Sequence, residues 1–363
     1  MKIAIVLGTR PEIIKLSPLV RECERRKVPY YILHTGQHYS YEMDKVFFEE
    51  LSLPPVKYNL DVGSASHAMQ TSKILAGVEN VLTADRPDMV LVQGDTNTVM
   101  AASLAASKLG IRVGHVESGL RSHDRSMPEE VNRVVADHIS DMLFAPTEEA
   151  RKNLAKEGIE KGVTVTGNTV VDAVNENRKL SDERSRLMEN LGLKAKEYVL
   201  ATAHRQENVD SSSRLKGMVE GMEAVGRETG MPIIFPAHPR TQNRLKEFGL
   251  NPRNVSVVQP FGYMDFLRME SHARLVLTDS GGVQEEACIL GVPCVTMREN
   301  TERPETVAVG ANMLAGTDPE RIQVAVWAML NRKTSWSNPF GDGHSASRIM
   351  DTVERGRGRF DGE

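Results

Sequence analysis

Short apolar runs alternate with amphipathic segments along the whole chain, and this alternation constrains the fold more than any other feature. It is typical of βα units arranged around a parallel sheet. The runs fall into two series. We expect strands at residues 3–7, 30–34, 89–93, 112–116, 142–145 and 163–166, and then at 198–203, 232–237, 255–258, 274–279 and 293–297. The sequence therefore predicts an α/β fold with two doubly wound parallel sheets.

The length of the chain also favours two domains. Its 363 residues exceed what one hydrophobic core usually serves, so we expect domains of roughly 150–200 residues. A charged helical segment that starts at Gly167 separates the two series of strands. This segment is the expected crossover between the domains.

Composition excludes several classes of protein. With 40% apolar residues, 26% charged residues and a formal net charge of −4, the chain has no overall attraction to nucleic acid or membranes. The first apolar run, residues 3–7, is too short to span a bilayer and lacks the features of a signal peptide. The cysteines Cys23, Cys288 and Cys294 are odd in number and lack metal-type spacing. This usage favours a reducing, cytoplasmic setting.

The stretch LGTRPEIIK, residues 7–15, predicts an anion site where the first strand meets a helix. Gly8 lets the backbone approach a ligand, Pro11 suits the first helical position, and the N–H groups there favour an anion. Lys15 is expected opposite the buried face of the helix, with Arg10 ahead of it. The expected buried face consists of Ile13, Leu16 and Val20. The alternative is a solvated lysine and a surface arginine. No P-loop or GxGxxG motif is present.

The stretch TDSGGVQEEACILGVP, residues 278–293, is the strongest anion signal. A strand leads into Ser280, Gly281 and Gly282, so a hydroxyl and several backbone N–H groups point at one spot, where a diphosphate would fit. The following helix is expected to bury Val283, Ala287 and Leu290. Glu285 and Glu286 lie off that face, and one of them could bind both hydroxyls of a ribose. A tight turn with solvated glutamates is the alternative.

Three carboxylates follow strands or begin helices in the first half of the chain. Asp95 lies in LVQGDTNTVMAA, where helix capping would also explain it. Glu117 directly follows a strand in HVESGLRSHDRSMPEEVNR, and Glu129 lies in the same stretch. Glu129 and Arg133 are four residues apart, so a surface ion pair is the alternative for them. The helix around them is expected to bury Val131, Val134 and Val135.

Basic residues follow strands in the second half of the chain. His204, in ATAHRQEN, could hydrogen-bond or protonate a phosphate because imidazole titrates near neutrality. FPAHPR and RENTERPE add His238, Arg298 and Arg303. Each of these has a structural role as its alternative. No metal site is predicted, because no HExxH motif, cysteine pair or calcium loop occurs.

Seven ordered blocks closely resemble the non-hydrolysing UDP-N-acetylglucosamine 2-epimerases: GTRPEIIK, GDTNT, HVESGLR, MPEEVNR, HRQEN, TDSGGVQEEA and NTERPE. The resemblance implies a GT-B architecture of two Rossmann-like domains facing across a cleft. The first would comprise residues 1–170 with a C-terminal helix at about 344–363 crossing back onto it, and the second, which binds UDP, residues 171–343. It further implies a cytoplasmic homodimer that needs no cofactor. This enzyme would interconvert UDP-GlcNAc and UDP-ManNAc and supply activated ManNAc for surface polysaccharide.

By position, the resemblance also implies roles for individual residues. The implied catalytic residues are Asp95, Glu117, Glu129 and His204. The implied contacts to the nucleotide and its phosphates are Arg10, Lys15, His204, Phe266, Ser280, Gly281, Gly282, Glu286 and Arg303, and His238 is a further candidate for substrate binding. Bacterial members bind a second UDP-GlcNAc as activator through a segment that resembles TGQHYSYEMD, residues 35–44, although the spacing after Gln37 is longer here.

The expected chemistry is elimination of UDP to a 2-acetamidoglucal, followed by re-addition with a proton on the other face of C2. Three other functions remain open at this point. A retaining glycosyltransferase would use the same fold but needs an acceptor groove. A hydrolysing epimerase would release free ManNAc and UDP. A non-catalytic nucleotide-sugar sensor would not need three acids.

Overall fold

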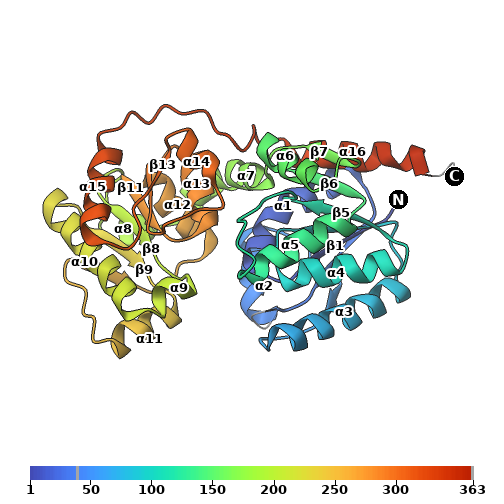
Figure 1. Cartoon of the computed structure of the whole chain (residues 1–363), viewed down its shortest axis with the longest axis horizontal. Helices are drawn as coiled ribbons and strands as arrows, with labels where there is room; N and C mark the ends of the chain where they lie inside the picture. Colours follow the sequence, from blue (N-terminus) through green and yellow to red (C-terminus); the bar gives the residue numbers. More distant parts are fainter. Residues whose placement is uncertain (38–40, 361–363) are drawn as a thin grey trace. The chain divides into compact units, whose positions relative to one another are not determined.

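The computed structural model describes residues 1–37 and 41–360, and the chain divides into two compact units (Figure 1). The first comprises Met1–Ala173 with Phe340–Glu363, and the second comprises Val174–Pro339. The segment that resembles the bacterial activator site includes residues 38–40, which lie outside the described residues. Within the described ranges, no helix is long and apolar enough to cross a membrane.

The first unit contains a seven-stranded parallel sheet in the order β3-β2-β1-β4-β5-β6-β7. Each strand except β3 and β7 is four or five residues long and largely buried, as expected of a sheet covered on both faces. The strands are β1 (Ile3–Leu7), β2 (Tyr30–His34), β3 (Tyr58–Asn59), β4 (Met89–Gln93), β5 (Arg112–Val116), β6 (Met142–Ala145) and β7 (Val163–Val165). The sequence did not predict β3, a two-residue strand at the edge of the sheet.

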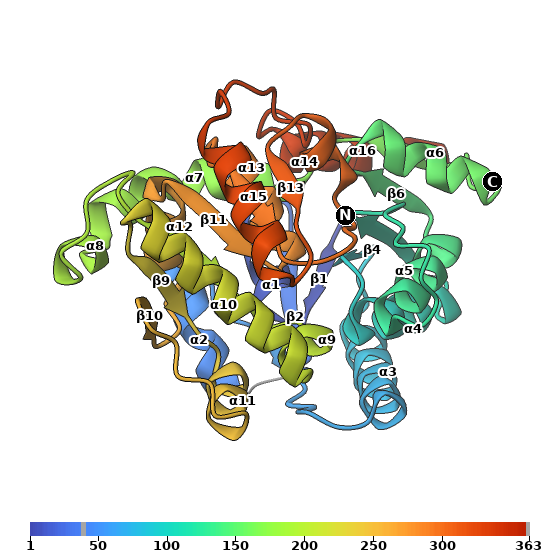
Figure 2. The same cartoon turned by 60° about the vertical axis from the view of Figure 1, so that its left-hand side comes forward.

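Helices cover both faces of this sheet (Figure 2). One face packs Ala4, Val6 and Val90 against α3, α4 and α5. The predicted inward face of α1 is confirmed, because Ile13, Leu16 and Val20 are buried. The helices of this unit are α1 (Arg10–Arg26), α2 (Tyr41–Glu50), α3 (His67–Ala84), α4 (Asn97–Lys108), α5 (Pro128–Ile139), α6 (Glu148–Lys156), the start of α7 (Thr169–Arg184) and α16 (Ser345–Phe360).

The C-terminal helix α16 packs on α1 within the first unit. The carboxylate of Asp172 accepts hydrogen bonds from the backbone N–H groups of Ser345 (3.2 Å) and Ala346 (2.9 Å). A carboxylate at a helix N-terminus is favoured by the helix dipole. Arg26 of α1 adds ion pairs to Asp351 and Glu354. Both ends of the chain therefore contribute to one unit.

The second unit contains a six-stranded parallel sheet in the order β10-β9-β8-β11-β12-β13. Its strands are β8 (Val199–Thr202), β9 (Ile233–Pro236), β10 (Val255–Val258), β11 (Leu275–Thr278), β12 (Cys294–Thr296) and β13 (Asn312–Leu314). The edge strand β13 was not predicted. The helices that begin in this unit are α8 (Leu187–Asn190), α9 (Gln206–Val209), α10 (Ser212–Thr229), α11 (Pro239–Glu247), α12 (Tyr263–His272), α13 (Gly281–Leu290), α14 (Pro304–Ala308) and α15 (Pro319–Leu330).

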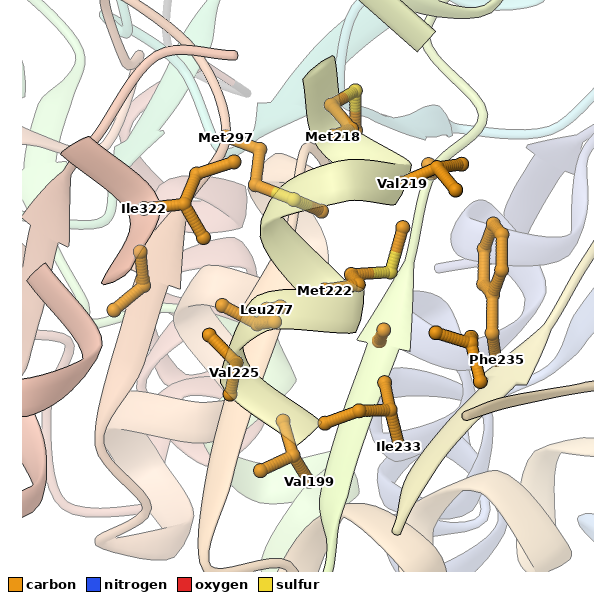
Figure 3. Close-up of a cluster of buried hydrophobic side chains, with 14 of the residues drawn as sticks. Val199, Met218, Val219, Met222, Val225, Ile233, Phe235, Leu277, Met297 and Ile322 are labelled. Carbon is orange, nitrogen blue, oxygen red and sulfur yellow. The ribbon is translucent and has the colours of Figure 1, made fainter. Parts of the chain in front are cut away.

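The core of the second unit lies between the sheet and helices α10 and α15 (Figure 3). Met218 and Met222 of α10 and Ile322 of α15 pack over Val199 and Phe235 of the sheet. All five side chains are fully buried. The packing fixes the strands whose ends carry the polar residues described below.

The order of strands reverses once in each sheet. In the first sheet the chain moves outward from β1 to β3 and returns to β4, so that β1 and β4 are neighbours. In the second sheet the same reversal places β8 beside β11. Ligands of open α/β sheets bind at the carboxyl ends of the strands at such a reversal. The predicted α/β fold with two doubly wound parallel sheets is confirmed.

Candidate active site

The predicted site residues of the first unit lie where its strand order reverses. Arg10 begins α1 directly after β1, Asp95 follows β4, and Glu117 follows the neighbouring strand β5. Because these strands are parallel and adjacent, their carboxyl ends bring the three side chains to one edge of the sheet. Glu129 lies at the start of α5.

Glu117 is the most enclosed of the predicted acids, with 7% of its surface exposed. Its Oε2 accepts a hydrogen bond from Lys15 Nζ at 2.7 Å and another from Gln93 Nε2. Its backbone has φ of +68°, a left-handed conformation that costs free energy in a residue other than glycine. The structure thus holds this carboxylate in a strained turn between an ammonium and an amide.

The alternative of a solvated Lys15 is not observed. Lys15 is buried, with 8% of its surface exposed, and its ammonium forms an ion pair with Glu117. A buried ion pair requires close geometry and further hydrogen bonds to offset the loss of hydration, and Gln93 supplies one of them. Helical periodicity does not reveal such a partner because Glu117 is 102 residues away.

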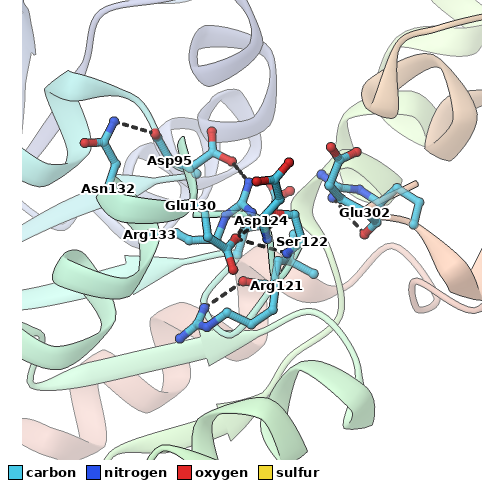
Figure 4. Close-up of polar contacts among 12 residues, drawn as sticks. Asp95, Arg121, Ser122, Asp124, Glu130, Asn132, Arg133 and Glu302 are labelled. Atoms are coloured by element: carbon cyan, nitrogen blue, oxygen red, sulfur yellow. Dashed lines mark hydrogen bonds and ion pairs between the residues drawn. The ribbon is translucent and has the colours of Figure 1, made fainter. Parts of the chain in front are cut away.

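Asp95 is held by Arg133, a contact that the sequence did not predict (Figure 4). The Arg133 guanidinium bridges the carboxylates of Asp95 and Glu130, and the Asp95 side chain remains 33% exposed. Asp95 is not the cap of α4, since Thr96 is its N-cap. Because Arg133 pairs with Asp95 and Glu130, the alternative of a surface ion pair between Glu129 and Arg133 is not observed.

Helix α5 faces the opposite way from our expectation. Val131 is 45% exposed, whereas Asn132, Arg133 and Asp137 are buried. Asn132 donates a hydrogen bond of 3.0 Å to the backbone oxygen of Asp95. A network of ion pairs and hydrogen bonds outweighs the burial of three valines here, because a charged group is costly to bury without its partner.

Glu130 connects α5 to the loop that follows Glu117. Its carboxylate accepts hydrogen bonds of 3.0 Å from the backbone N–H groups of Ser122 and His123. Burial alone would raise the pKa of Glu130, but these bonds and the Arg133 guanidinium lower it. Glu129, the preceding residue, is half-buried, and among the described residues no hydrogen bond or ion pair to its carboxylate is found. Its carboxylate is the least constrained of the three predicted acids.

The anion site expected at the start of α1 is already occupied by a side chain of the same helix. Glu12 Oε2 accepts hydrogen bonds from the backbone N–H groups of Gly8 (2.6 Å) and Thr9 (2.9 Å). Its Oε1 accepts a bond of 2.5 Å from the Thr96 hydroxyl. The N–H groups of Gly8 and Thr9 are therefore bonded within the protein, and Glu12 ties the loop before Arg10 to the loop that carries Asp95.

A buried histidine supports the backbone beside Asp95. His115 Nδ1 lies 2.7 Å from Asp137 Oδ1, and Nε2 lies 2.8 Å from the backbone oxygen of Gly94. Both neighbours are acceptors, so both ring nitrogens donate and the imidazole is positively charged. Burial opposes this charge, but Asp137 outweighs it and raises the pKa of His115. His115 thereby fixes the peptide that precedes Asp95.

Arg10 lies at the first position of α1 and is partly buried. Its guanidinium carbon lies 4.9 Å from the centre of the Phe47 ring, within the range of a cation–π contact. The aromatic face limits the conformations of the arginine without neutralising its charge. Arg10 thus belongs to the same edge of the sheet as Asp95 and Glu117.

In the second unit, Asp279 joins the two loops at the strand reversal. Its fully buried carboxylate accepts hydrogen bonds from the backbone N–H groups of His204 and Arg205 at 3.0–3.1 Å. Asn208 adds a bond of 3.2 Å. His204 Nδ1 lies 3.5 Å from Asp279 Oδ1, and the histidine side chain is 49% exposed. The structure thus orients an exposed imidazole directly after β8.

The turn at Ser280–Gly282 begins α13, as predicted. Its first N–H groups have no partner within the helix, because the first turn of any helix leaves them unpaired. A Cβ added at Gly281 would lie 3.7 Å from Glu302 and 3.9 Å from Arg205, so the side chains of these two residues lie beside the turn.

Two buried ion pairs surround this turn. Arg298 binds both carboxylate oxygens of Glu302 at 2.9 Å, and Arg303 Nε binds Glu285 Oε1 at 2.6 Å. Burial would raise the pKa of Glu302, but the Arg298 guanidinium lowers it to about 2. The expectation that Glu285 lies off the buried face of α13 is wrong, and so is the alternative of a solvated glutamate, since Glu285 is fully buried against Arg303.

The remaining predicted residues lie on neighbouring elements of the second unit. Phe266 of α12 and Glu286 of α13 are both half-buried. Val283, expected in the core, is likewise only half-buried. His238 is the N-cap of α11, and its Nδ1 accepts a hydrogen bond of 3.3 Å from the Arg240 backbone N–H. The structure therefore gives His238 a local structural role.

The residues that sequence reasoning missed all lie close to predicted ones in the chain. They are Glu12, Gln93, His115, Glu130, Arg133, Asp137 and Asp279. All but Gln93 and Asp137 are part of the quoted blocks, and Gln93 directly precedes one of them. Their polar type at expected strand ends or in the block MPEEVNR was the available signal. Among the described residues, no cluster of three or more histidine, cysteine, aspartate or glutamate side chains has a metal-binding arrangement.

Comparison with known proteins identifies the family. The model of the family described as UDP-N-acetylglucosamine 2-epimerase matches residues 21–354. The UDP-N-acetylglucosamine 2-epimerase of Methanocaldococcus jannaschii is 54% identical, over 98% of this chain and 100% of its own. The UDP-2,3-diacetamido-2,3-dideoxy-D-glucuronate 2-epimerase of Pseudomonas aeruginosa is 38% identical, over 98% and 100% respectively.

A solved structure extends this similarity to three dimensions. The crystal structure of the M. jannaschii enzyme in complex with UDP-GlcNAc and UDP matches 98% of this chain and 100% of that chain, with a TM-score of 0.92. The predicted GT-B class of fold is confirmed by this match and by the two parallel sheets. The chain belongs to the UDP-N-acetylglucosamine 2-epimerase family.

Proposed function

We propose that this enzyme interconverts UDP-GlcNAc and UDP-ManNAc by inverting C2 of the sugar. The observation that carries the proposal is the pair of carboxylates held by cations at the strand reversal of the first unit: Glu117 with Lys15, and Asp95 with Arg133. An epimerase needs carboxylates that are fixed, ionised and close to one another. The M. jannaschii relative, whose crystal structure contains UDP-GlcNAc and UDP, supports the choice of substrate.

The reaction begins with departure of the diphosphate. The hydrogen on C2 is not acidic while UDP is attached, but positive charge develops on the ring as the C1–O bond breaks. A nearby carboxylate then takes the C2 proton, which gives a 2-acetamidoglucal and UDP. Donors aimed at the departing diphosphate lower this barrier, and we assign them to Arg10, His204, Arg303 and the Ser280–Gly282 turn. Lys15 belongs to the same set in our proposal and also balances the charge of Glu117.

Inversion requires proton transfer at both faces of C2. We assign this chemistry to Asp95, Glu117 and Glu129, without dividing removal and return of the proton among them. A positioned acid or base contributes a factor of about 100 to 10,000. Re-addition of UDP to the glycal then completes the cycle.

The second unit supplies the nucleotide contacts in this proposal. We assign binding of the diphosphate to the backbone N–H groups of Gly281 and Gly282, with Arg303, which is paired with Glu285, as a further contact. We assign contact with the ribose hydroxyls to Glu286 and contact with the nucleoside to Phe266. His238 remains a proposed substrate contact beside its role as a cap. We further propose that the enzyme is a cytoplasmic homodimer and supplies activated ManNAc for surface polysaccharide.

Product analysis tests the proposed reaction. Incubation with UDP-GlcNAc should yield UDP-ManNAc in equilibrium with the substrate. Release of free ManNAc and UDP would indicate a hydrolysing epimerase, transfer of the sugar to an acceptor a glycosyltransferase, and absence of turnover a nucleotide-sugar sensor. UDP-2,3-diacetamido-2,3-dideoxy-D-glucuronate should be included as a second substrate, and preferential turnover of it would contradict the proposal.

Arg10→Ala is expected to weaken UDP binding by about tenfold or more, because hydrogen bonds to charged groups contribute roughly 1.5–3 kcal/mol. Titration calorimetry with UDP measures the effect. Arg25→Ala serves as the control, because Arg25 lies on the same helix with its side chain 65% exposed. Equal UDP affinity of wild type and Arg10→Ala would exclude Arg10 from the phosphate site.

A further inference from the structure

A fully buried histidine of β5 contacts the loop that carries Asp95. His115 Nε2 lies 2.8 Å from the backbone oxygen of Gly94. A carbonyl oxygen only accepts hydrogen bonds, so Nε2 is the donor in this contact. In the sheet His115 pairs with Val92 of β4, which brings its side chain to the loop directly after that strand. One side chain of β5 thus holds the peptide between Gly94 and Asp95.

Asp137 of α5 fixes the orientation of the His115 ring. Its Oδ1 lies 2.7 Å from His115 Nδ1. Its Oδ2 pairs with Arg121 Nη1 at 2.7 Å and accepts a hydrogen bond of 3.1 Å from the Gly119 backbone N–H. The side chains of all three charged or polar partners are buried, so turning the carboxylate away would leave buried donors unpaired. With Nδ1 bound to Asp137, Nε2 faces Gly94.

The loop that carries Asp95 owes its shape to contacts with β5 and α5. Gly94 has φ of +87°, a conformation that glycine adopts freely but that hydrogen bonds must hold in place. Its N–H donates to the backbone oxygen of Val116 at 3.1 Å. The backbone oxygen of Asp95 itself accepts a hydrogen bond of 3.0 Å from Asn132. The peptides on both sides of Asp95 are therefore fixed.

The inward face of α5 also holds the Asp95 side chain (Figure 4). Arg133 forms an ion pair with the Asp95 carboxylate, and Asp137 follows Arg133 by four residues on the same face of the helix. A rotation of the peptide before Asp95 would move its carboxylate relative to Arg133. A displacement of about 1 Å can lower the rate of an enzyme on the order of 100-fold.

We propose that His115 is a positioning residue for Asp95: its Nε2–H fixes the Gly94 carbonyl and thereby the place of the Asp95 carboxylate beside C2 of the sugar. The inference rests on the proposed role of Asp95 in proton transfer. It adds that the rate depends on the hydrogen bond to Gly94 and not on the charge of the imidazole. His115 acts through the loop alone, because its own side chain is fully buried.

Two amide substitutions separate the two hydrogen bonds of His115. The amide nitrogen of His115→Gln reaches the position of Nε2 and can donate to Gly94, whereas that of His115→Asn lies at the position of Nδ1 and can donate only to Asp137. Both variants are uncharged, and each keeps one buried bond. We expect kcat for UDP-ManNAc formation to fall on the order of 100-fold in His115→Asn and less than about tenfold in His115→Gln.

UDP affinity, measured by calorimetry, should stay within a few fold of wild type in both variants, because Asp95 acts on the sugar. Circular dichroism establishes that they are folded at the assay temperature. An equal loss of kcat in His115→Asn and His115→Gln, or a wild-type kcat in His115→Asn, would overturn the proposal.

A double-mutant cycle with Asp95→Asn tests whether His115 acts through Asp95. Substitutions that act through one group are not additive. Once Asp95 is replaced, the further change His115→Asn should therefore lower kcat by less than about threefold. A further loss on the order of 100-fold in the double variant would show that His115 acts elsewhere and would overturn the proposal.

The same variants distinguish this inference from the proposed function. A wild-type rate in Asp95→Asn would remove Asp95 from the mechanism, and the role of His115 would fail with it. A slow Asp95→Asn together with equal rates in the two His115 variants would overturn the role of His115 alone. Failure of wild type to convert UDP-GlcNAc would overturn the proposed function itself.

NMR of the wild-type enzyme supplies a test if His115→Asn does not fold. In protein labelled with isotopic nitrogen in histidine, the His115 ring should carry a proton on Nε2, and its signals are identified by their absence from His115→Gln. A His115 ring without a proton on Nε2 would overturn the proposal, because it could not donate to Gly94.

Discussion

Glu117→Gln is expected to reduce epimerisation of UDP-GlcNAc by a factor of about 100 to 10,000, the usual contribution of a positioned acid or base. Glutamine has the size of glutamate and can accept the hydrogen bonds from Lys15 and Gln93, so the local structure should persist. It cannot accept a proton from carbon. Initial rates of UDP-ManNAc formation measure the loss.

UDP affinity provides the internal comparison for this variant. Because Glu117 acts on the sugar in our account, the affinity of Glu117→Gln for UDP should stay within a few fold of wild type. Glu149→Gln is a matched control, since Glu149 lies in the first turn of α6 with a side chain that is 47% exposed. Turnover of Glu117→Gln at a rate close to that of the control would remove Glu117 from the mechanism.

Glu12→Ala is expected to lower the free energy of unfolding by on the order of 3 kcal/mol. The substitution leaves the N–H groups of Gly8 and Thr9 and the hydroxyl of Thr96 without their acceptor in a buried place. Thermal unfolding should show a fall in Tm of roughly 5–10 °C. Glu12→Gln is the control, because its oxygen can accept from the two N–H groups while its amide donates to Thr96.

The two Glu12 variants also differ in how stability depends on pH. Burial raises the pKa of Glu12 to about 7, although hydrogen bonds from Thr96 and Gly8 oppose this, and its ordinary value is 4.5. Its contribution is therefore complete below about pH 4.5 and declines as the pH rises to 7. Relative to Glu12→Gln, wild type should lose about 3 kcal/mol over that window. A difference independent of pH would contradict this assignment.

Local pattern was sufficient to predict all strands but β3 and β13. The expected strands correspond to β1, β2 and β4–β12, and most of them are runs of largely buried apolar residues. The edge strands β3 and β13 have only two and three residues. In the folded protein they pair with β2 and β12, respectively.

The sequence predicted the residues of the candidate site better than it predicted the contacts between them. Arg10, Asp95, Glu117, His204 and the Ser280–Gly282 turn lie directly at strand ends or helix starts, as the sequence suggested. Their partners were not predictable, because ion pairs such as that of Lys15 with Glu117 join residues 102 positions apart. The orientation of α5 shows the same limit: apolar spacing favoured its valines as the inward face, whereas long-range polar contacts buried Asn132 and Arg133 instead.

The central claim is that the enzyme removes and returns the C2 proton of the sugar while UDP is detached. Incubation of the enzyme with UDP-GlcNAc in heavy water, followed by NMR of the recovered nucleotide sugars, tests it directly. Our account predicts that deuterium appears at C2 of both UDP-ManNAc and UDP-GlcNAc as the reaction approaches equilibrium. Formation of UDP-ManNAc that retains the original hydrogen at C2 would contradict it.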